Sequence, residues 1–210
     1  MDIESRPRRR GLDGARFNHA SVIKSSVVEW LIDNGASIDG THVLNSPLYM
    51  ACRKNQIDVV DILLANGCNV NTKLYYNLDG KGLFTTPLFI ASSEGFLSII
   101  DRLVVNGADI HMVNVEGETS LFMAVYNKQL AAAKKLIEYG VDINKCGGHE
   151  MMTPLMIDAK NSDMEMVLML LDMGADPTIK TVKEKTAWHF TSDPEIKAVL
   201  EKTSIKWNSG

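Results

Sequence analysis

The chain contains one near match to a catalytic zinc motif. His149-Glu150-Met151-Met152-Thr153 approaches the pattern His-Glu-x-x-His, in which two histidines on one helix face hold zinc and the glutamate acts as general base. Thr153 stands where the second histidine is needed, and we expect this segment in a loop and helix cap. Other possible ligands, Cys146, His42 and His111, are expected in separate loops, whereas structural zinc needs four ligands at one point. We therefore expect no metal and no cofactor.

Other catalytic patterns have no counterpart in the sequence. Asp79-Gly80-Lys81-Gly82 lacks both the spacing of a phosphate-binding loop and the Ser or Thr that would follow it. A Gly-x-Ser-x-Gly nucleophile elbow does not occur. The sequence therefore predicts that the protein is not an enzyme.

The composition excludes several classes of protein. The 210 residues are 45% hydrophobic with a net charge of −4, and no run approaches the roughly 20 apolar residues that a membrane span requires. We expect no membrane insertion, and the mildly acidic balance makes nucleic acid an unlikely partner, because phosphate binding needs clustered Lys and Arg. Three cysteines and no secretory signal predict a reducing compartment, cytoplasmic and/or nuclear.

Four segments of the chain begin alike and reach a glycine at the same distance. Each starts with Ser or Thr, then Pro or Ser, then Leu, and a glycine follows 21 residues after the start. The pairs are Ser46 and Gly67, Thr86 and Gly107, Thr119 and Gly140, and Thr153 and Gly174. A looser fifth copy begins at Thr186. Because the starts lie about 33 residues apart with one longer interval, the chain consists of internal repeats.

The local chemistry of each copy predicts two short helices. The initial Ser or Thr can accept hydrogen bonds from the first turn of a helix, and proline loses nothing at the next position. The glycine suits the carboxyl end of a second helix, where the chain turns left-handed. Before Gly107, Ile99-Ile100 and Leu103-Val104 form an apolar stripe at helical spacing, and the other copies have apolar pairs there too.

These segments resemble the ankyrin repeat, whose signature is Thr-Pro-Leu-His-x-Ala with a period near 33. The tails after the helices strengthen the resemblance, as in Gly107-Ala108-Asp109-Ile110-His111. It implies an all-α solenoid of helix-turn-helix units with β-hairpin-like loops. The expected organisation is a disordered basic tail (1–11), a single array (12–204) and a frayed end (205–210). The array divides into a degenerate first repeat (12–40), then 41–73, 74–113 with an insertion at 73–84, 114–146, 147–180 and a closing cap (181–204).

Two positions depart from the pattern. The insertion at 73–84 carries Tyr75 and Tyr76, and either it folds back on its own repeat or it contacts a partner. Asp158 occupies a slot that holds alanine in the other copies, where a carboxylate would be costly without a partner. Either the helix shifts by one residue so that Ala159 fills the slot, or Asp158 is hydrogen-bonded.

The resemblance implies that a partner docks on the concave face made by loop tips and inner helices. We therefore expect a non-catalytic scaffold, a monomeric array that binds another protein or peptide in this groove and at the long loop. Tyr126 and Met152 are the best anchor candidates, because both are large and apolar. The full set of candidate contact residues is Arg53, Lys54, Tyr75, Tyr76, Glu94, Glu116, Glu118, Tyr126, Asn127, His149, Met152 and Lys160.

Other interpretations stay open. The chain could be a targeting or adaptor fragment of a larger protein, or an effector of an intracellular pathogen. Asn71, His111 and Asn144 each follow a leucine by eight residues, the spacing seen where ankyrin-like proteins are hydroxylated by an asparaginyl hydroxylase. The basic tail at Arg6–Arg10 is either a solvated arm or a signal for nuclear import or an acidic partner.

Overall fold

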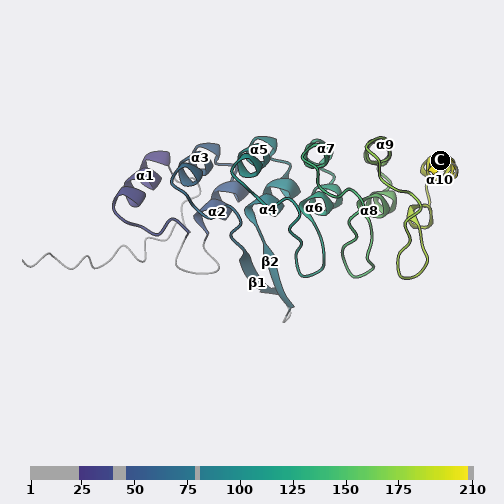
Figure 1. Ribbon diagram of the computed structural model, residues 1–210, viewed down its shortest axis with the longest axis horizontal. Helices are drawn as coiled ribbons and strands as arrows, with labels where there is room; N and C mark the ends of the chain where they lie inside the picture. The colour runs from purple at the N-terminus through teal and green to yellow at the C-terminus, as the bar shows by residue number, and fades with distance from the viewer. Residues whose placement is uncertain (1–23, 40–45, 79–80, 208–210) are drawn as a thin grey trace, which may run out of the picture.

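The chain forms two stacked rows of short helices in the computed structural model, which describes residues 24–39, 46–78 and 81–207. The outer helices are α1 (Ser25–Asp33), α3 (Ile57–Ala65), α5 (Leu97–Val105), α7 (Leu130–Glu138) and α9 (Met164–Asp172). The inner helices are α2 (Pro47–Arg53), α4 (Pro87–Glu94), α6 (Ser120–Tyr126) and α8 (Pro154–Asn161). A 3₁₀ helix, η1 (Ala187–Phe190), and helix α10 (Pro194–Trp207) close the array (Figure 1). The predicted helical solenoid is confirmed.

The predicted caps begin the inner helices. The hydroxyl oxygens of Ser46, Thr86, Thr119 and Thr153 each accept a hydrogen bond from the backbone N–H three residues later, at 3.1–3.3 Å. This bond satisfies one of the N–H groups that a first helical turn leaves without a partner. All four inner helices therefore start at the same point of the repeat, which places their carboxyl ends at equivalent positions.

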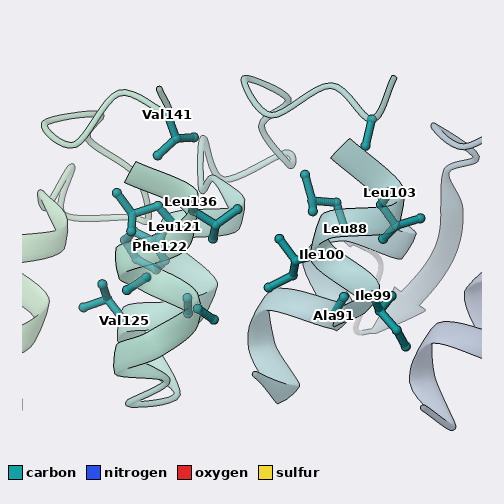
Figure 2. Packing of buried hydrophobic residues seen from close by; sticks show 14 of the residues in the cluster. Leu88, Ala91, Ile99, Ile100, Leu103, Leu121, Phe122, Val125, Leu136 and Val141 are labelled. Carbon is teal, nitrogen blue, oxygen red and sulfur yellow. The ribbon is translucent and has the colours of Figure 1, made fainter. Parts of the chain in front are cut away.

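A continuous core runs between the two rows. Leu103, Ile99 and Ile100 of α5 have no exposed surface, and Leu88 of the adjoining inner helix is only 3% exposed. Figure 2 shows these side chains meeting between an inner and an outer helix, with the same arrangement one unit further along. Each inner helix packs on the next inner helix and on its own outer helix, as expected for stacked repeats.

Polar bonds join neighbouring units in two places, in the segments after the outer helices and on the outer helices themselves. Asn71 Oδ1 accepts from the backbone N–H of Asp109 at 2.8 Å, and Asn144 Oδ1 accepts from that of Asp176 at 2.9 Å. On the outer helices, Lys135 Nζ lies 2.6 Å from Asp101 Oδ1. These bonds hold each unit in register with the next.

The insertion forms a β-hairpin. Strands β1 (Leu74–Leu78) and β2 (Lys81–Thr85) pair antiparallel, with Leu74 opposite Thr85 and Tyr75 opposite Phe84. The hairpin extends from between α3 and α4 on the side of the inner helices (Figure 1). The other connections in the described part of the chain contribute a single isolated bridge, between Gly147 and Met152. In the described part of the chain, the insertion is therefore the one segment with strand pairing over several residues.

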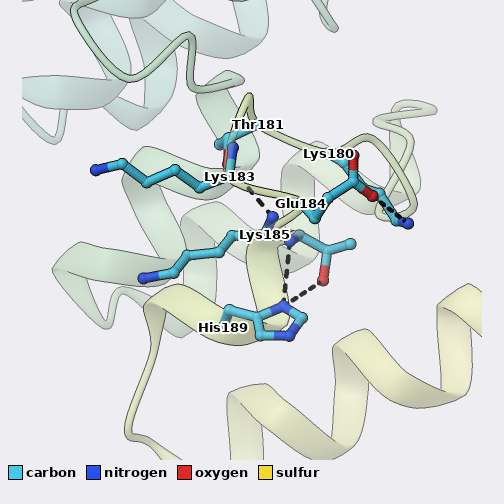
Figure 3. A network of polar contacts seen from close by, with 7 residues as sticks. Lys180, Thr181, Lys183, Glu184, Lys185 and His189 are labelled. Atoms are coloured by element: carbon cyan, nitrogen blue, oxygen red, sulfur yellow. Dashed lines mark hydrogen bonds and ion pairs between the residues drawn. The ribbon is translucent and has the colours of Figure 1, made fainter.

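The carboxyl-terminal cap carries its own polar network. The backbone N–H of Thr186 donates to Nδ1 of His189 at 3.1 Å, and Lys180 Nζ lies 2.7 Å from Glu184 Oε2 (Figure 3). Helix α10 continues to Trp207, so residues 205–207, expected to fray, are helical. The expected basic tail and the first helix of the first repeat lie outside the described residues.

Both expectations for Asp158 are wrong. The cap at Thr153 keeps α8 in the same register as the other inner helices, so Asp158 remains in the alanine slot and Ala159 follows it. Both residues are fully buried. Neither carboxylate oxygen of Asp158 has a hydrogen-bond partner among the described residues. The fifth unit therefore contains a buried, unsatisfied carboxyl group where the other units have a methyl group.

Candidate partner-binding surface

Equivalent positions at the ends of the inner helices form one line of side chains along the array, which we call the inner-helix row. Each unit contributes the two positions that directly precede the turn from the inner helix to the outer helix. Tyr126 is 61% exposed, and the rest are exposed except Ser93 and Asn161, which are half-buried. The row consists of Arg53 and Lys54, Ser93 and Glu94, Tyr126 and Asn127, and Lys160 and Asn161.

The backbone after each inner helix fixes the position of the row. The next residue is left-handed every time, with φ of +54° at Asn55, +75° at Gly95, +57° at Lys128 and +54° at Ser162. This conformation ends the inner helix and turns the chain into the outer helix. The row is therefore held between a capped helix start and a fixed turn, although its side chains differ from unit to unit.

The charged and aromatic members of the row are open to solvent. No ion pair within the described residues involves the charged or aromatic members of the row, which are Arg53, Lys54, Glu94, Tyr126 and Lys160. Five of the predicted contact residues thus carry groups that a partner could engage without breaking an existing pair. Asn127 is also exposed, and its Nδ2 donates to the carbonyl of Met123 at 2.8 Å.

An apolar strip that the sequence prediction missed accompanies the row. Met50, Ile90 and Met123 lie four positions before Lys54, Glu94 and Asn127, and each is half-buried. Residues four apart share a face of a helix, so each polar position has an apolar neighbour one turn away. The spacing itself was the available signal, because it recurs in every unit.

Three predicted contact residues are instead engaged with the array itself. Glu116 Oε1 lies 3.3 Å from His149 Nε2, which joins the loop before α6 to the loop before α8. Glu118 is half-buried and accepts a hydrogen bond from Asn114 Nδ2 at 2.7 Å. Burial raises the pKa of the Glu118 carboxyl, and the bond from Asn114 opposes part of that increase. A partner would have to compete for these groups.

Met152 is not an exposed anchor. Its side chain is 5% exposed and belongs to the continuous core, because its backbone pairs with Gly147 and directs the side chain inward. The prediction that Met152 presents an apolar surface is therefore wrong. Its neighbour Met151 is 47% exposed.

The hairpin both folds back and presents an aromatic ring. Leu74 and Phe84 at its base are 9% and 8% exposed, which agrees with a loop that packs on its own repeat. Tyr75 is 47% exposed, with its ring centre 5.7 Å from that of Phe84, and Lys73 Nζ lies 4.8 Å from the centre of the Phe84 ring. The side chain of Tyr76 lies outside the described part of the structure.

Comparison with known proteins decides the family. A family model described as ankyrin repeats in three copies matches residues 7–73 and 85–181, most of the chain. The chain belongs to the ankyrin-repeat family. Ankyrin repeats are generally protein–protein interaction modules and generally non-catalytic.

Three curated relatives share parts of the ankyrin array. Ankyrin repeat and SOCS box protein 9 from Homo sapiens is 37% identical over 67 residues, 32% of this chain and 22% of that protein. BTB/POZ domain and ankyrin repeat-containing protein BOP from Lupinus luteus is 39% identical over 75 residues, 35% of this chain and 15% of the relative. Ankyrin repeat and SAM domain-containing protein 6 from Rattus norvegicus is 33% identical over 79 residues, which are 38% of this chain and 9% of that protein. The chain therefore matches less than a quarter of the length of each relative.

The three positions with hydroxylase-type spacing differ in their bonding within the ankyrin array. Asn71 and Asn144 make the bonds between units described above, whereas no corresponding side-chain bond from His111 occurs in the described residues. A modification at either asparagine would therefore act on a junction between two repeats. Hydroxylation itself stays a prediction.

Metal-binding side chains do not cluster in the ankyrin array over residues 24–39, 46–78 and 81–207. No group of three or more His, Cys, Asp and Glu side chains could hold a metal ion there, and His42 lies outside these ranges. Cys52, Cys68 and Cys146 are free thiols, and burial raises the pKa of the Cys52 thiol. Within the same ranges, no helix has the length and apolar character needed to cross a membrane.

Proposed function

We propose that this ankyrin array is a non-catalytic protein–protein interaction scaffold that holds a partner protein or peptide along the inner-helix row. The observation that carries the proposal is a regular backbone with varied, exposed side chains at its equivalent positions. Stacked repeats produce extended binding surfaces in this way. Tyr126 is the leading anchor, because a large aromatic side chain is left 61% exposed at the middle of the row.

The hairpin is the second contact in this proposal. Tyr75 is exposed at the base of the hairpin, where the buried Leu74 precedes it and the buried Phe84 lies opposite. A rigid base lowers the entropic cost of ordering the hairpin against a partner. We propose that it contacts the partner beside the inner-helix row.

An adaptor role within a larger protein is the alternative. The names of the three relatives combine ankyrin repeats with a SOCS box, a BTB/POZ domain or a SAM domain, and the chain matches only a small part of each. In that case the inner-helix row would select the partner and another domain would act on it. The free thiols support a reducing location, cytoplasmic or nuclear, for either version.

A comparative capture experiment tests the scaffold proposal. The immobilised chain and a variant carrying Arg53→Glu, Tyr126→Ala and Lys160→Glu are exposed to cell lysate, and retained proteins are identified by mass spectrometry. The expected result is a protein that the wild type retains and the variant loses. Thermal unfolding of both proteins must show that the variant is folded.

A matched control separates the row from general surface charge. Lys134→Glu, Leu168→Ala and Lys202→Glu together make the same kinds of change at exposed positions on α7, α9 and α10. This variant should retain the partner. Equal retention by the wild type and both variants would place the binding surface elsewhere and reject the inner-helix row.

A further inference from the structure

We propose that the inner-helix row recognises an extended peptide whose residues alternate in charge with a three-residue step. Read from α2 to α8, the peptide would present an acidic residue, a basic residue, an apolar residue and an acidic residue. The proposal rests on the proposed function, because it specifies the partner of the same surface.

The order of charges comes from the row itself. Helix α2 ends at the cation Arg53 and is followed by the cation Lys54, whereas α4 ends in the anion Glu94. Helix α6 offers the aromatic ring of Tyr126 and α8 offers the cation Lys160. A complementary partner must therefore change sign between α2 and α4 and again toward α8. A uniformly acidic chain would meet repulsion at α4, and a uniformly basic chain would meet repulsion at both α2 and α8.

A hollow beside α2 provides a further site for the acidic residue at the α2 end of the peptide. It has a volume of about 490 Å³ and lies at the turn between α2 and α3, next to the start of α1. Among the described residues that line it, Lys24 and Lys54 are cations and Asp58 is the one acidic side chain. Two cations against one anion leave a positive balance where an acidic side chain can enter.

The three-residue step comes from the spacing of the inner helices. Helices α2, α4, α6 and α8 pack side by side in this order, and packed helices lie about 8–10 Å apart. A chain in the extended polyproline II conformation advances about 3.1 Å per residue with three residues per turn, so three residues carry it about 9 Å, from one inner helix to the next, and every third side chain faces the same side. Positions one, four, seven and ten of a peptide would then face the four helices in turn.

The polar members of the row favour an extended peptide over a helical one. Ser93, Asn127 and Asn161 alternate with the charged and aromatic side chains. Hydroxyl and amide groups can bond to the backbone N–H and C=O groups of an extended chain, whereas a helix satisfies those groups internally. The half-buried Met123 beside Asn127 provides apolar contact for the residue at position seven.

Synthetic peptides test the inference by fluorescence anisotropy with the full chain. The probe is a labelled twelve-residue peptide with Glu, Lys, Leu and Glu at positions one, four, seven and ten, and Ser or Thr elsewhere. A second probe has the reverse order, because the direction of the chain along the row is open. A permuted peptide of the same composition begins with Lys and places Glu at positions four and seven.

We expect one of the two ordered peptides to bind at least about tenfold more tightly than the permuted peptide, with an advantage that shrinks in high salt. A variant carrying Arg53→Glu, Lys54→Glu and Glu94→Lys should lose that peptide. It should instead bind a peptide in which the Glu that faces α2 and the Lys that faces α4 are exchanged. Restored binding by paired charge reversal would be specific to direct contact and could not follow from a folding defect.

Three results would overturn the inference. One is equal binding of ordered and permuted peptides, and another is tighter binding of a peptide with the same residues at the seven-residue spacing of a helix. The third is no binding of either ordered peptide at about 1 mM. If the capture experiment still shows a partner that depends on the row, the scaffold function stands and only the peptide motif fails. If capture is also independent of the row, both proposals fail.

Discussion

Asp158→Ala is expected to stabilise the array at neutral pH, and to do so more strongly as the pH rises. Asp158 is fully buried in α8, and its carboxylate oxygens have no hydrogen-bond partner within the described chain. Burial, with a further contribution from Asp163, raises the pKa of the Asp158 carboxyl to about 8 against the opposing charge of Lys128. The same carboxyl in an unfolded chain has a pKa of about 4.

The sign and size of the effect follow from these two pKa values. Between them the unfolded chain is ionised and the folded chain keeps its proton, so the free energy of unfolding falls as the pH rises. The slope is about 1.4 kcal/mol per pH unit, which amounts to a loss on the order of 4 kcal/mol by pH 7. Below pH of about 4 both states are protonated and the penalty disappears. Above pH of about 8 both are ionised and the penalty stops growing.

Alanine removes the titrating group and fits the site. Ala51, Ala91 and Ala124 fill the equivalent slots and are at most 2% exposed. We expect Asp158→Ala to raise the free energy of unfolding by about 2–4 kcal/mol at pH 7, allowing for partial relaxation around the carboxyl group in the wild type. Asp158→Asn should remove the pH dependence but keep an unsatisfied polar group, so it should stabilise less than alanine.

Urea unfolding followed by circular dichroism between pH 5 and pH 8 measures the effect. Asp172→Ala, at the exposed end of α9, is the matched control and should change the free energy of unfolding by no more than about 0.5 kcal/mol at any pH. The reasoning is refuted if Asp158→Ala is no more stable than the wild type. It is also refuted if the difference between the two proteins stays constant across the pH range.

Three further substitutions test the fold, each by urea unfolding. Leu103→Ala empties a fully buried site and should cost about 2–5 kcal/mol; a cost below about 0.5 kcal/mol would remove Leu103 from the core. Ser162→Gly relieves a φ of +54° at the position where α4 has Gly95, and should gain about 0.5–1 kcal/mol, whereas a loss would contradict strain there. His111→Asn should gain about 0.5–1.5 kcal/mol by adding the bond that Asn71 makes to the next unit at 2.8 Å. No gain would mean that the backbone at His111 is placed differently.

The repeat and its core could be predicted from the sequence because their signals are local. A cap at Thr86, an apolar pair at Ile99-Ile100 and a glycine at Gly107 each act within one or two helical turns. Their repetition then determines the stacking. The same logic placed Tyr126 and Lys160 correctly at the exposed ends of their helices.

The loop tips were harder to predict because their neighbours come from the next unit. Met152 is buried through a backbone pair with Gly147, and helical periodicity says nothing about such a pair. Glu116 and His149 pair although they lie one repeat apart in the sequence. A search for acidic residues one repeat period away from a lysine, arginine or histidine would have found this contact. It would also have found Lys183 and Glu150, which lie 33 positions apart and 3.2 Å from one another.

The same rule supports the proposal that a partner binds along the inner-helix row. Opposite charges one period apart pair in the loops and on the outer helices, as Asp101 and Lys135 do at 2.6 Å. Lys54 and Glu94 occupy equivalent positions of adjacent units and have opposite charges, yet no ion pair joins them. The pairs in the loops and outer helices hold the units together, and a partner would have to break them to bind there. The charges of the row remain solvated, so a partner needs only to replace water.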